Sequence, residues 1–160
     1  MRVTELLKKY GYIDDKYFTK EMTDRGTEAH RELAEYTLTN RMTLNPYLDS
    51  YTKFLTDFRV KIIQVEKRLE YNGISGTPDY VCIINGHRAI IDIKTGNRQK
   101  WWGIQLQAYK WLYEKNYPDE RIIILQDIKL TTTEKYTVYP VELKGEEFYI
   151  WQKILKEEGI

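Results

Sequence analysis

The chain has 160 residues, of which 42% are hydrophobic and 31% are charged, and its formal net charge is +1. These values exclude a disordered chain and a strongly basic, histone-like protein, and they predict a single domain over residues 1–160. The one cysteine, Cys82, excludes an internal disulfide and an iron–sulfur cluster held by several cysteines of this chain. No apolar run approaches a membrane span and the N-terminus lacks a signal-peptide pattern, so we expect a soluble cytoplasmic protein without a membrane partner.

The first predicted elements are helices, in an N-terminal part over residues 1–58. Apolar residues recur at helical spacing over residues 25–39 and again over 46–58, with a break at Asn45-Pro46 between them. The core is expected over residues 59–142, and a closing helix over 143–160. Within the core the pattern predicts these elements: strands at 60–70, 74–84, 87–94, 121–126 and 136–141, and a helix at 100–116.

The Asn85-Gly86 pair determines how the predicted strands are arranged. Both residue types tolerate positive φ, as a two-residue hairpin turn requires, so the strands on either side should pair antiparallel. The strands between residues 60 and 94 are therefore predicted to form a three-stranded antiparallel meander. The apolar run at 122–125 is typical of a strand covered on both faces, whereas Pro140 indicates an edge strand. The expected fold class is α/β (α+β), a central mixed sheet flanked by helices.

The same hairpin brings acidic residues together. Antiparallel pairing about the turn places Asp79 opposite Asp92, and side-chain alternation puts Lys94 on the same face as Asp92. Two adjacent carboxylates repel each other unless a cation lies between them, and Mg²⁺ or Mn²⁺ suits such oxygen ligands. A metal of this kind with a nearby ammonium has the parts needed to hydrolyse a phosphodiester. The alternative is that all three are solvated turn and strand residues.

Two longer motifs resemble a known family. Residues 76–79, Gly-Thr-Pro-Asp, and residues 90–96, Ile-Ile-Asp-Ile-Lys-Thr-Gly, resemble the core motif of the PD-(D/E)xK nuclease superfamily. Gln105 and Tyr109, which share a helix face, resemble the Gln-x-x-x-Tyr motif of its RecB-like exonuclease branch. That branch includes the RecB and AddB nuclease domains, the CRISPR adaptation nucleases and many viral exonucleases. The resemblance implies a restriction-endonuclease-like core, in which Gln105 and Tyr109 face the active site and orient DNA or the catalytic lysine.

The resemblance also implies roles for the remaining motif residues. Asp79, Asp92 and the Ile93 carbonyl would bind Mg²⁺ or Mn²⁺, and Lys94 would be the catalytic cation. Residues 25–30, Arg-Gly-Thr-Glu-Ala-His, resemble the family's Gly-x-x-x-His motif, in which the histidine is often a further metal ligand. His30 is thus a candidate ligand, although a single helical histidine is equally compatible with a structural or surface role.

Five other residues are candidates for binding metal or DNA, and each also has a simpler structural interpretation. Glu66, on the first predicted strand, could be a metal ligand or a solvated strand residue. Arg98, Lys100, Trp101 and Trp102 combine positive charge with aromatic rings, which suits contact with phosphates and bases. The alternative is that one tryptophan belongs to the core and the other covers the start of the helix.

These features together indicate a Mg²⁺- or Mn²⁺-dependent DNA nuclease without an iron–sulfur cluster. The resemblance favours an exonuclease that acts on DNA ends or single strands in replication, recombination or repair, in a viral or mobile-element setting. The expected partner is DNA, and a homo-oligomer or a replication or recombination protein is a further candidate partner. Two alternatives stay open: a non-catalytic nucleic-acid-binding module on a nuclease scaffold, and a structure-specific endonuclease.

Overall fold

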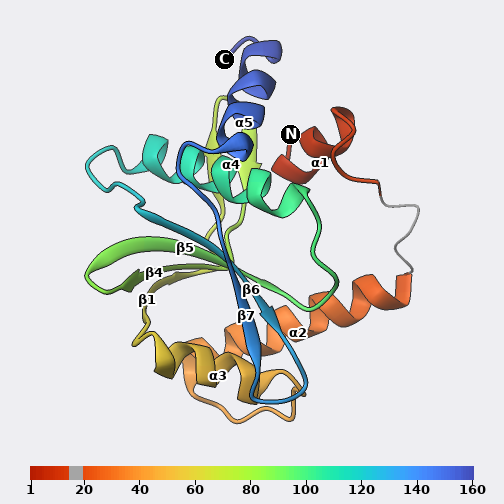
Figure 1. The fold of residues 1–160 in the computed structure, drawn as a ribbon, viewed down its shortest axis with the longest axis vertical. Helices are drawn as coiled ribbons and strands as arrows, with labels where there is room; N and C mark the ends of the chain where they lie inside the picture. Colours follow the sequence, from red (N-terminus) through yellow and green to blue (C-terminus); the bar gives the residue numbers. More distant parts are fainter. Residues whose placement is uncertain (15–19) are drawn as a thin grey trace.

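The computed structural model describes residues 1–14 and 20–160, and the side chains of the second helix from residue 27 onward (Figure 1). The helices are α1 (Val3–Lys9), α2 (Lys20–Thr39), α3 (Leu48–Asp57), α4 (Trp101–Asn116) and α5 (Glu146–Glu157). The strands are β1 (Lys61–Val65), β2 (Leu69–Tyr71), β3 (Ile74–Gly76), β4 (Tyr80–Ile84), β5 (His87–Lys94), β6 (Ile124–Leu130) and β7 (Tyr136–Pro140). None of the described helices is long and apolar enough to cross a membrane.

Five strands form the central sheet, in the order β1-β4-β5-β6-β7. Strands β1, β4 and β5 are the predicted antiparallel meander, and Tyr80 pairs with Ile91 as the hairpin register requires. Asn85 and Gly86 both have positive φ, 52° and 79°, which confirms the predicted turn. Helix α4 connects β5 to its parallel neighbour β6, and β7 closes the sheet as an antiparallel edge strand. The mixed sheet flanked by helices confirms the predicted fold class.

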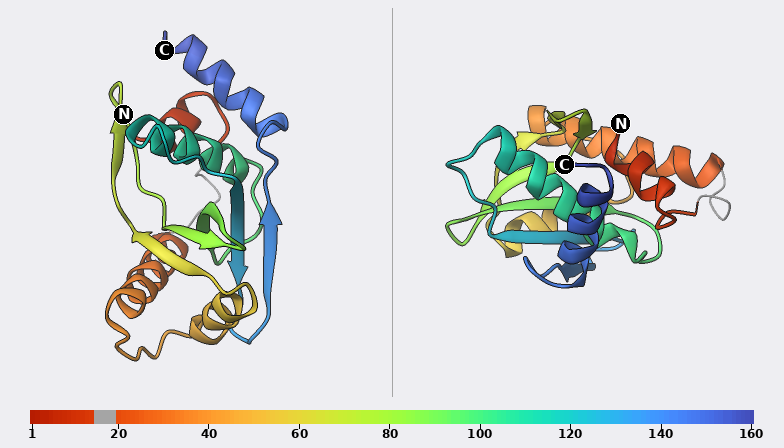
Figure 2. Two further views of the ribbon diagram at one scale, coloured as in Figure 1. Left: turned by 90° about the vertical axis from the view of Figure 1, so that its left-hand side faces the viewer. Right: turned by 90° about the horizontal axis from the view of Figure 1, so that it is seen from above.

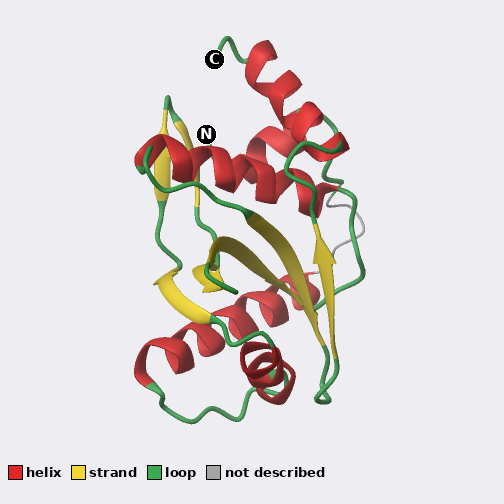
Figure 3. Ribbon diagram, turned by 60° about the vertical axis from the view of Figure 1, so that its left-hand side comes forward, coloured by secondary structure: helices red, strands yellow, loops and turns green. Residues whose placement is uncertain are grey.

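Two of the predicted strands are interrupted. The strand predicted at 60–70 breaks at Glu66, whose positive φ of 46° turns the chain, and its remainder becomes β2. The strand predicted at 74–84 breaks at residues 77–79, where Pro78 has no N–H to donate to a neighbouring strand. Strands β2 and β3 instead pair with each other as a separate antiparallel hairpin beside α4 (Figure 3).

Other predicted boundaries are also wrong. The helix predicted at 25–39 begins earlier, at Lys20. The strand predicted at 121–126 lies further along the chain, at Ile124–Leu130. The predicted strand stopped just before Asp127, although Asp127 lies inside the strand. A buried charge in a strand contradicts the usual pattern of apolar inward positions, so the periodicity alone could not reveal it.

Two layers of helices enclose the sheet (Figures 1 and 2). Helices α1, α4 and α5 and the β2–β3 hairpin pack on one face, with Ile90 and Leu125 pointing toward them. Helices α2 and α3 pack on the other, against Cys82, Ile91 and Ile93. Burial on both faces explains the continuous apolar runs in β4 and β5. Because side chains alternate along a strand, the even-numbered residues at the end of β5 face α4.

Candidate active site

Asp79 and Asp92 lie side by side at the end of the β4–β5 hairpin. The Asp79 N–H donates to Asp92 Oδ1 at 3.2 Å, and the Ile93 N–H donates to Asp79 Oδ2 at 2.7 Å. Each aspartate is thus held by the backbone of the opposite strand, as the predicted register requires. The side chain of Asp92 is 6% exposed and that of Asp79 is 13% exposed, so the pair is largely shielded from water.

Each carboxylate is next to one cationic side chain. His30 Nδ1 lies 3.3 Å from Asp79 Oδ1, and Lys94 Nζ lies 2.8 Å from Asp92 Oδ2. Lys94 comes from β5 itself, whereas His30 reaches the site from α2. Residues 25 and 26, which begin the predicted Gly-x-x-x-His motif, lie outside the residues whose side chains are described. The structure therefore brings four of the predicted site residues into one cluster of alternating charge.

The pKa values of this cluster follow from burial and from the paired charges. Burial opposes the charge on His30, but the neighbouring Asp79 raises its pKa to about 9. Burial and Asp79 together raise the pKa of Asp92 to about 6, against the opposing effect of Lys94. His30 lowers the pKa of Asp79 despite its burial, and Asp92 raises the pKa of Lys94 despite its burial. Asp92 is therefore the member of the pair whose negative charge is less well compensated.

Helix α4 supplies the side chains that surround Lys94. The Lys94 ammonium donates to Gln105 Oε1 at 2.8 Å. It also lies 4.9 Å from the centre of the Trp101 ring and 5.4 Å from that of Trp102, within the range of cation–π attraction. Trp102 is only 5% exposed and belongs to the interior, whereas Trp101 is partly exposed. Lys94 is thus fixed by an anion, an amide and two rings.

Tyr109 lies one helical turn after Gln105 and packs against the Gly-x-Pro-Asp segment. A Cβ atom placed on Gly76 would lie 2.7 Å from Tyr109 Cε1, so only glycine allows the ring to lie there. Burial raises the pKa of the Tyr109 hydroxyl well above its usual value, so the residue is a neutral phenol. The two motifs that carried the family resemblance are therefore in direct contact.

The remaining predicted residues lie at the margin of this cluster. Glu66 is exposed, and its N–H donates to the Asp79 carbonyl at 2.9 Å, while burial and the charge of Asp79 raise the pKa of its carboxyl. Arg98 is exposed, with its guanidinium carbon 4.5 Å from the centre of the Tyr139 ring. Lys100 pairs with Glu146 at 3.3 Å on the surface. None of these three bonds the carboxylates of the pair through its side chain.

Sequence reasoning missed Asp127 as a candidate site residue. It lies on β6 directly opposite Asp92 in the parallel register and is only 1% exposed. Its Oδ1 atom has no hydrogen-bond partner among the described residues. Burial raises the pKa of Asp127 to about 8, and the Asp92 carboxylate adds to this while Lys94 opposes it. Leu125, Asp127 and Lys129 lie on one face of β6, and a buried acid among inward-facing positions is not what strand alternation predicts, so the pattern held no signal for it.

No three His, Cys, Asp or Glu side chains in the described part of the chain are arranged as a ready-made metal cage. The oxygens of Asp79 and Asp92 are engaged by His30, Lys94 and two backbone N–H groups instead. The donor types are nonetheless those that a divalent cation uses, namely carboxylate oxygens with an imidazole. A cation at this site would replace the histidine and lysine as the partners of the carboxylates.

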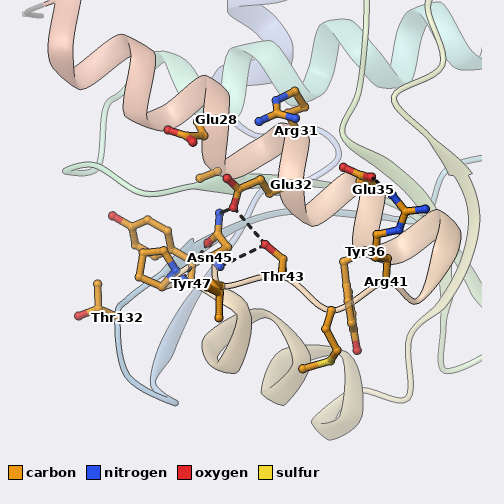
Figure 4. Close-up of a pocket in the computed structure, with 14 residues that line it drawn as sticks. Glu28, Arg31, Glu32, Glu35, Tyr36, Arg41, Thr43, Asn45, Tyr47 and Thr132 are labelled. Atoms are coloured by element: carbon orange, nitrogen blue, oxygen red, sulfur yellow. Dashed lines mark hydrogen bonds and ion pairs between the residues drawn. The ribbon is translucent and has the colours of Figure 1, made fainter.

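A hollow of about 780 Å³ beside α2 is lined by none of the predicted site residues (Figure 4). It lies between α2 and the loop over residues 40–47 (Figure 4). The Glu32 carboxylate accepts hydrogen bonds there from Thr43 Oγ1 at 3.1 Å and from Asn45 Nδ2 at 3.0 Å. These bonds fasten the loop to the helix, so the hollow is a consequence of how the loop is attached.

The profile of the PD-(D/E)XK nuclease superfamily matches residues 7–160. Comparison with curated proteins gave no match. A candidate exonuclease from Eubacterium rectale is similar in structure, with a TM-score of 0.52 at 10% identity over 96% of this chain and 70% of that one. The alkaline exonuclease LHK-Exo from Laribacter hongkongensis has a TM-score of 0.47 at 13% identity, with 98% and 86% covered.

A third structure, SSO0001, has a TM-score of 0.41 at 16% identity over 96% of this chain, and the chain spans 64% of its length. At identities this low the structural similarity concerns the fold alone, and the Eubacterium rectale protein, with its TM-score of 0.52, supports it. The superfamily profile carries more information, because its match includes both strands of the Asp79–Asp92 hairpin and helix α4. The chain belongs to the PD-(D/E)XK nuclease superfamily.

Proposed function

We propose that the protein is a DNA nuclease that depends on Mg²⁺ or Mn²⁺ and hydrolyses phosphodiester bonds. The observation that carries this proposal is the convergence of Asp79, Asp92 and Lys94 at one end of the β4–β5 hairpin, with the Lys94 ammonium held by Gln105. A structural ion pair would not require two interlocked carboxylates, because burying charges costs free energy that apolar side chains would not cost. Groups arranged at such a cost are typical of catalytic sites.

The residues present fit a divalent cation. Asp79, Asp92 and the Ile93 carbonyl would supply oxygen ligands, and His30 would supply a nitrogen ligand. Burial, and after it the charge of Asp79, raise the pKa of Asp92, and a divalent cation between the two carboxylates would oppose both effects. When bound, such a cation polarises a phosphoryl oxygen and lowers the pKa of a water ligand. Glu66 is close enough to Asp79 to add charge to the same region.

Lys94 is the residue whose side chain would contact the reacting phosphate. Its ammonium stabilises the negative charge that develops on the phosphoryl oxygens or on the attacking hydroxide. Gln105 and the Trp101 and Trp102 rings restrict its position, so little reorganisation is needed when charge develops. Tyr109 supports this arrangement from the next turn of α4, against Gly76.

The DNA path in this proposal runs over the exposed groups next to Lys94. Arg98 and Lys100 would contact phosphates, and the partly exposed Trp101 would stack on a base. Action on DNA ends or single strands, in replication, recombination or repair, is favoured by the resemblance of Gln105 and Tyr109 to the RecB-like motif. A viral or mobile-element setting is part of the same inference.

Metal removal tests the proposed function. We expect the protein to degrade end-labelled linear DNA in Mg²⁺ or Mn²⁺ and to lose this activity completely in EDTA, because the reaction needs the polarising cation. Single- and double-stranded DNA, linear and circular, should be compared on denaturing gels. Cleavage of closed circles would favour the endonuclease alternative. Binding without cleavage in either metal would favour the non-catalytic binding module, and cleavage that persists in EDTA would contradict the proposal.

The ligand role of His30 is tested by His30→Ala. We expect the affinity for Mn²⁺, measured by isothermal titration calorimetry, to fall by at least about tenfold, the scale on which metal sites lose affinity when a supporting group is removed. His87→Ala is the matched control, because His87 is exposed at the start of β5. An unchanged affinity in the His30 variant would mean that the histidine only compensates the charge of Asp79.

A further inference from the structure

Asp127 is a buried acidic residue that has no role in the catalysis proposed above. It lies on β6 in register with Asp92, on the sheet face that α4 covers. The side chain is 1% exposed, and its Oδ1 atom has no hydrogen-bond partner among the described residues. A buried polar atom without a hydrogen-bond partner lowers the stability of the folded protein. Natural proteins keep such groups where they serve function, so Asp127 calls for a functional explanation.

The charges around Asp127 come from three parts of the chain. Lys94 and Asp92 on β5, Asp79 in the segment before β4 and Arg98 in the loop before α4 all act on Asp127 through their charges. Of the two cations, Lys94 lowers the pKa of Asp127 more than Arg98 does. Asp127 in turn is among the main groups that raise the pKa of Lys94. The two do not form a direct ion pair, because Lys94 is drawn toward Asp92 and Gln105.

The Lys94 ammonium has three N–H donors, and its contacts with Asp92 and Gln105 use two of them. Asp92 Oδ2 and Gln105 Oε1 each accept one at 2.8 Å. A divalent cation bound by Asp92 competes for the same carboxylate oxygens. Lys94 would then lose its ion pair inside a largely buried site, where an unpaired charge is costly. The next carboxylate on the same face, one strand further, is Asp127.

We propose that Asp127 is a positioning residue that retains the Lys94 ammonium on the α4 face of the sheet when the Asp92 carboxylate is engaged by a divalent cation. This inference rests on the proposed metal-dependent function. Asp127 acts through Lys94 and does not touch DNA. Its Oδ1 atom, which has no hydrogen-bond partner among the described residues, would accept the N–H that Lys94 no longer donates to Asp92.

The test is Asp127→Asn, which keeps the shape of the side chain and removes its ability to ionise beside Lys94. Without metal, we expect the Tm to stay the same or rise by about 2–4 °C, because burial penalises an ionisable carboxyl group and the amide cannot ionise. In Mg²⁺, we expect kcat to fall about 10- to 100-fold, while KM and the affinity for DNA change less than about twofold. Asp57→Asn is the control, since Asp57 is a carboxylate paired with Lys53 and Tyr136 away from the site.

A second measurement does not depend on nuclease activity. Lys94 can be acetylated by an amine-reactive ester, and the modified peptide quantified by mass spectrometry with and without Mg²⁺. In the wild type we expect low labelling in both conditions, whereas in Asp127→Asn we expect Mg²⁺ to raise Lys94 labelling about tenfold or more. Gln105→Ala provides a reference for a lysine that has lost one acceptor.

The outcomes separate this inference from the proposed function. A wild-type protein that neither binds Mg²⁺ nor cuts DNA overturns the proposed function, and the inference that rests on it falls with it. A wild-type protein that cuts DNA, beside an Asn variant with unchanged kcat and unchanged Lys94 labelling, overturns the role of Asp127 alone. If the variant loses kcat and its Tm also falls, Asp127 has a structural role. That result would also overturn the positioning role.

Discussion

Lys94→Ala is expected to reduce DNA cleavage by about 10²–10³-fold, the effect of removing one preorganised group that stabilises developing charge. The loss should appear in kcat rather than in KM, because Lys94 acts on the transition state and is largely buried in the free protein. The measurement is the rate of single-turnover cleavage at saturating DNA and Mg²⁺. Lys129→Ala is the matched control. Lys129 is the residue of β6 that lies opposite Lys94 in the parallel register, and the proposed catalysis gives it no role.

The same substitution should also destabilise the protein. Without the ammonium, Asp92 is left buried beside Asp79 and Asp127 with no ion-pair partner, which costs about 3–5 kcal/mol of unfolding free energy. Adding Asp92→Asn to Lys94→Ala removes the orphaned charge. The double variant should therefore regain most of the unfolding free energy measured in urea without regaining cleavage. If Lys94→Ala cleaves DNA at the wild-type rate, Lys94 is not the catalytic cation.

Gly76→Ala is expected to lower both stability and activity. The added methyl group would lie 2.7 Å from Tyr109 Cε1 and 3.1 Å from Leu112 Cδ1, and both side chains are buried. Forcing a group into a packed core costs about 1–3 kcal/mol of unfolding free energy. The ring of Tyr109 must move, and Gln105 on the same helix positions Lys94, so a shift of about 1 Å should reduce cleavage about 10²-fold.

Gly96→Ala is the matched control for this effect on stability. A Cβ atom at Gly96 would meet nothing within 4 Å, so its unfolding free energy should stay within about 0.5 kcal/mol of the wild-type value. Urea unfolding followed by tryptophan fluorescence measures both variants. A Gly76→Ala protein as stable and as active as the wild type would show that the contact between Gly76 and Tyr109 is not needed for either property.

Local sequence signals predicted the part of the site that lies within one hairpin. Asn85-Gly86 identified the turn, and because strand pairing is then fixed residue by residue, the juxtaposition of Asp79 and Asp92 followed. The position of Lys94 followed from alternation along the same strand. The helix that carries Gln105 and Tyr109 was predicted almost to its ends for a similar reason, since its signals lie within the helix itself.

Other features depended on contacts that a local pattern does not contain. The interruptions at Glu66 and Pro78 were missed because both flanking stretches have the composition of strands, and only the packing of the β2–β3 hairpin beside α4 separates them. The burial of Trp102 and the exposure of Trp101 could not be assigned from two adjacent rings. Their difference follows from which side of α4 faces the sheet.

The sequence by itself determined the fold class, the hairpin and the convergence of Asp79, Asp92 and Lys94 at its end, because turn chemistry and strand alternation act over a few residues. Only the tertiary structure decided what surrounds them. In the folded protein, His30 of α2 contacts Asp79, and Tyr109 packs against Gly76. Asp127 lies beside Asp92 because β5 and β6 pair in parallel. These contacts join segments far apart in the chain, and their energies depend on burial, which exists only once the layers have packed.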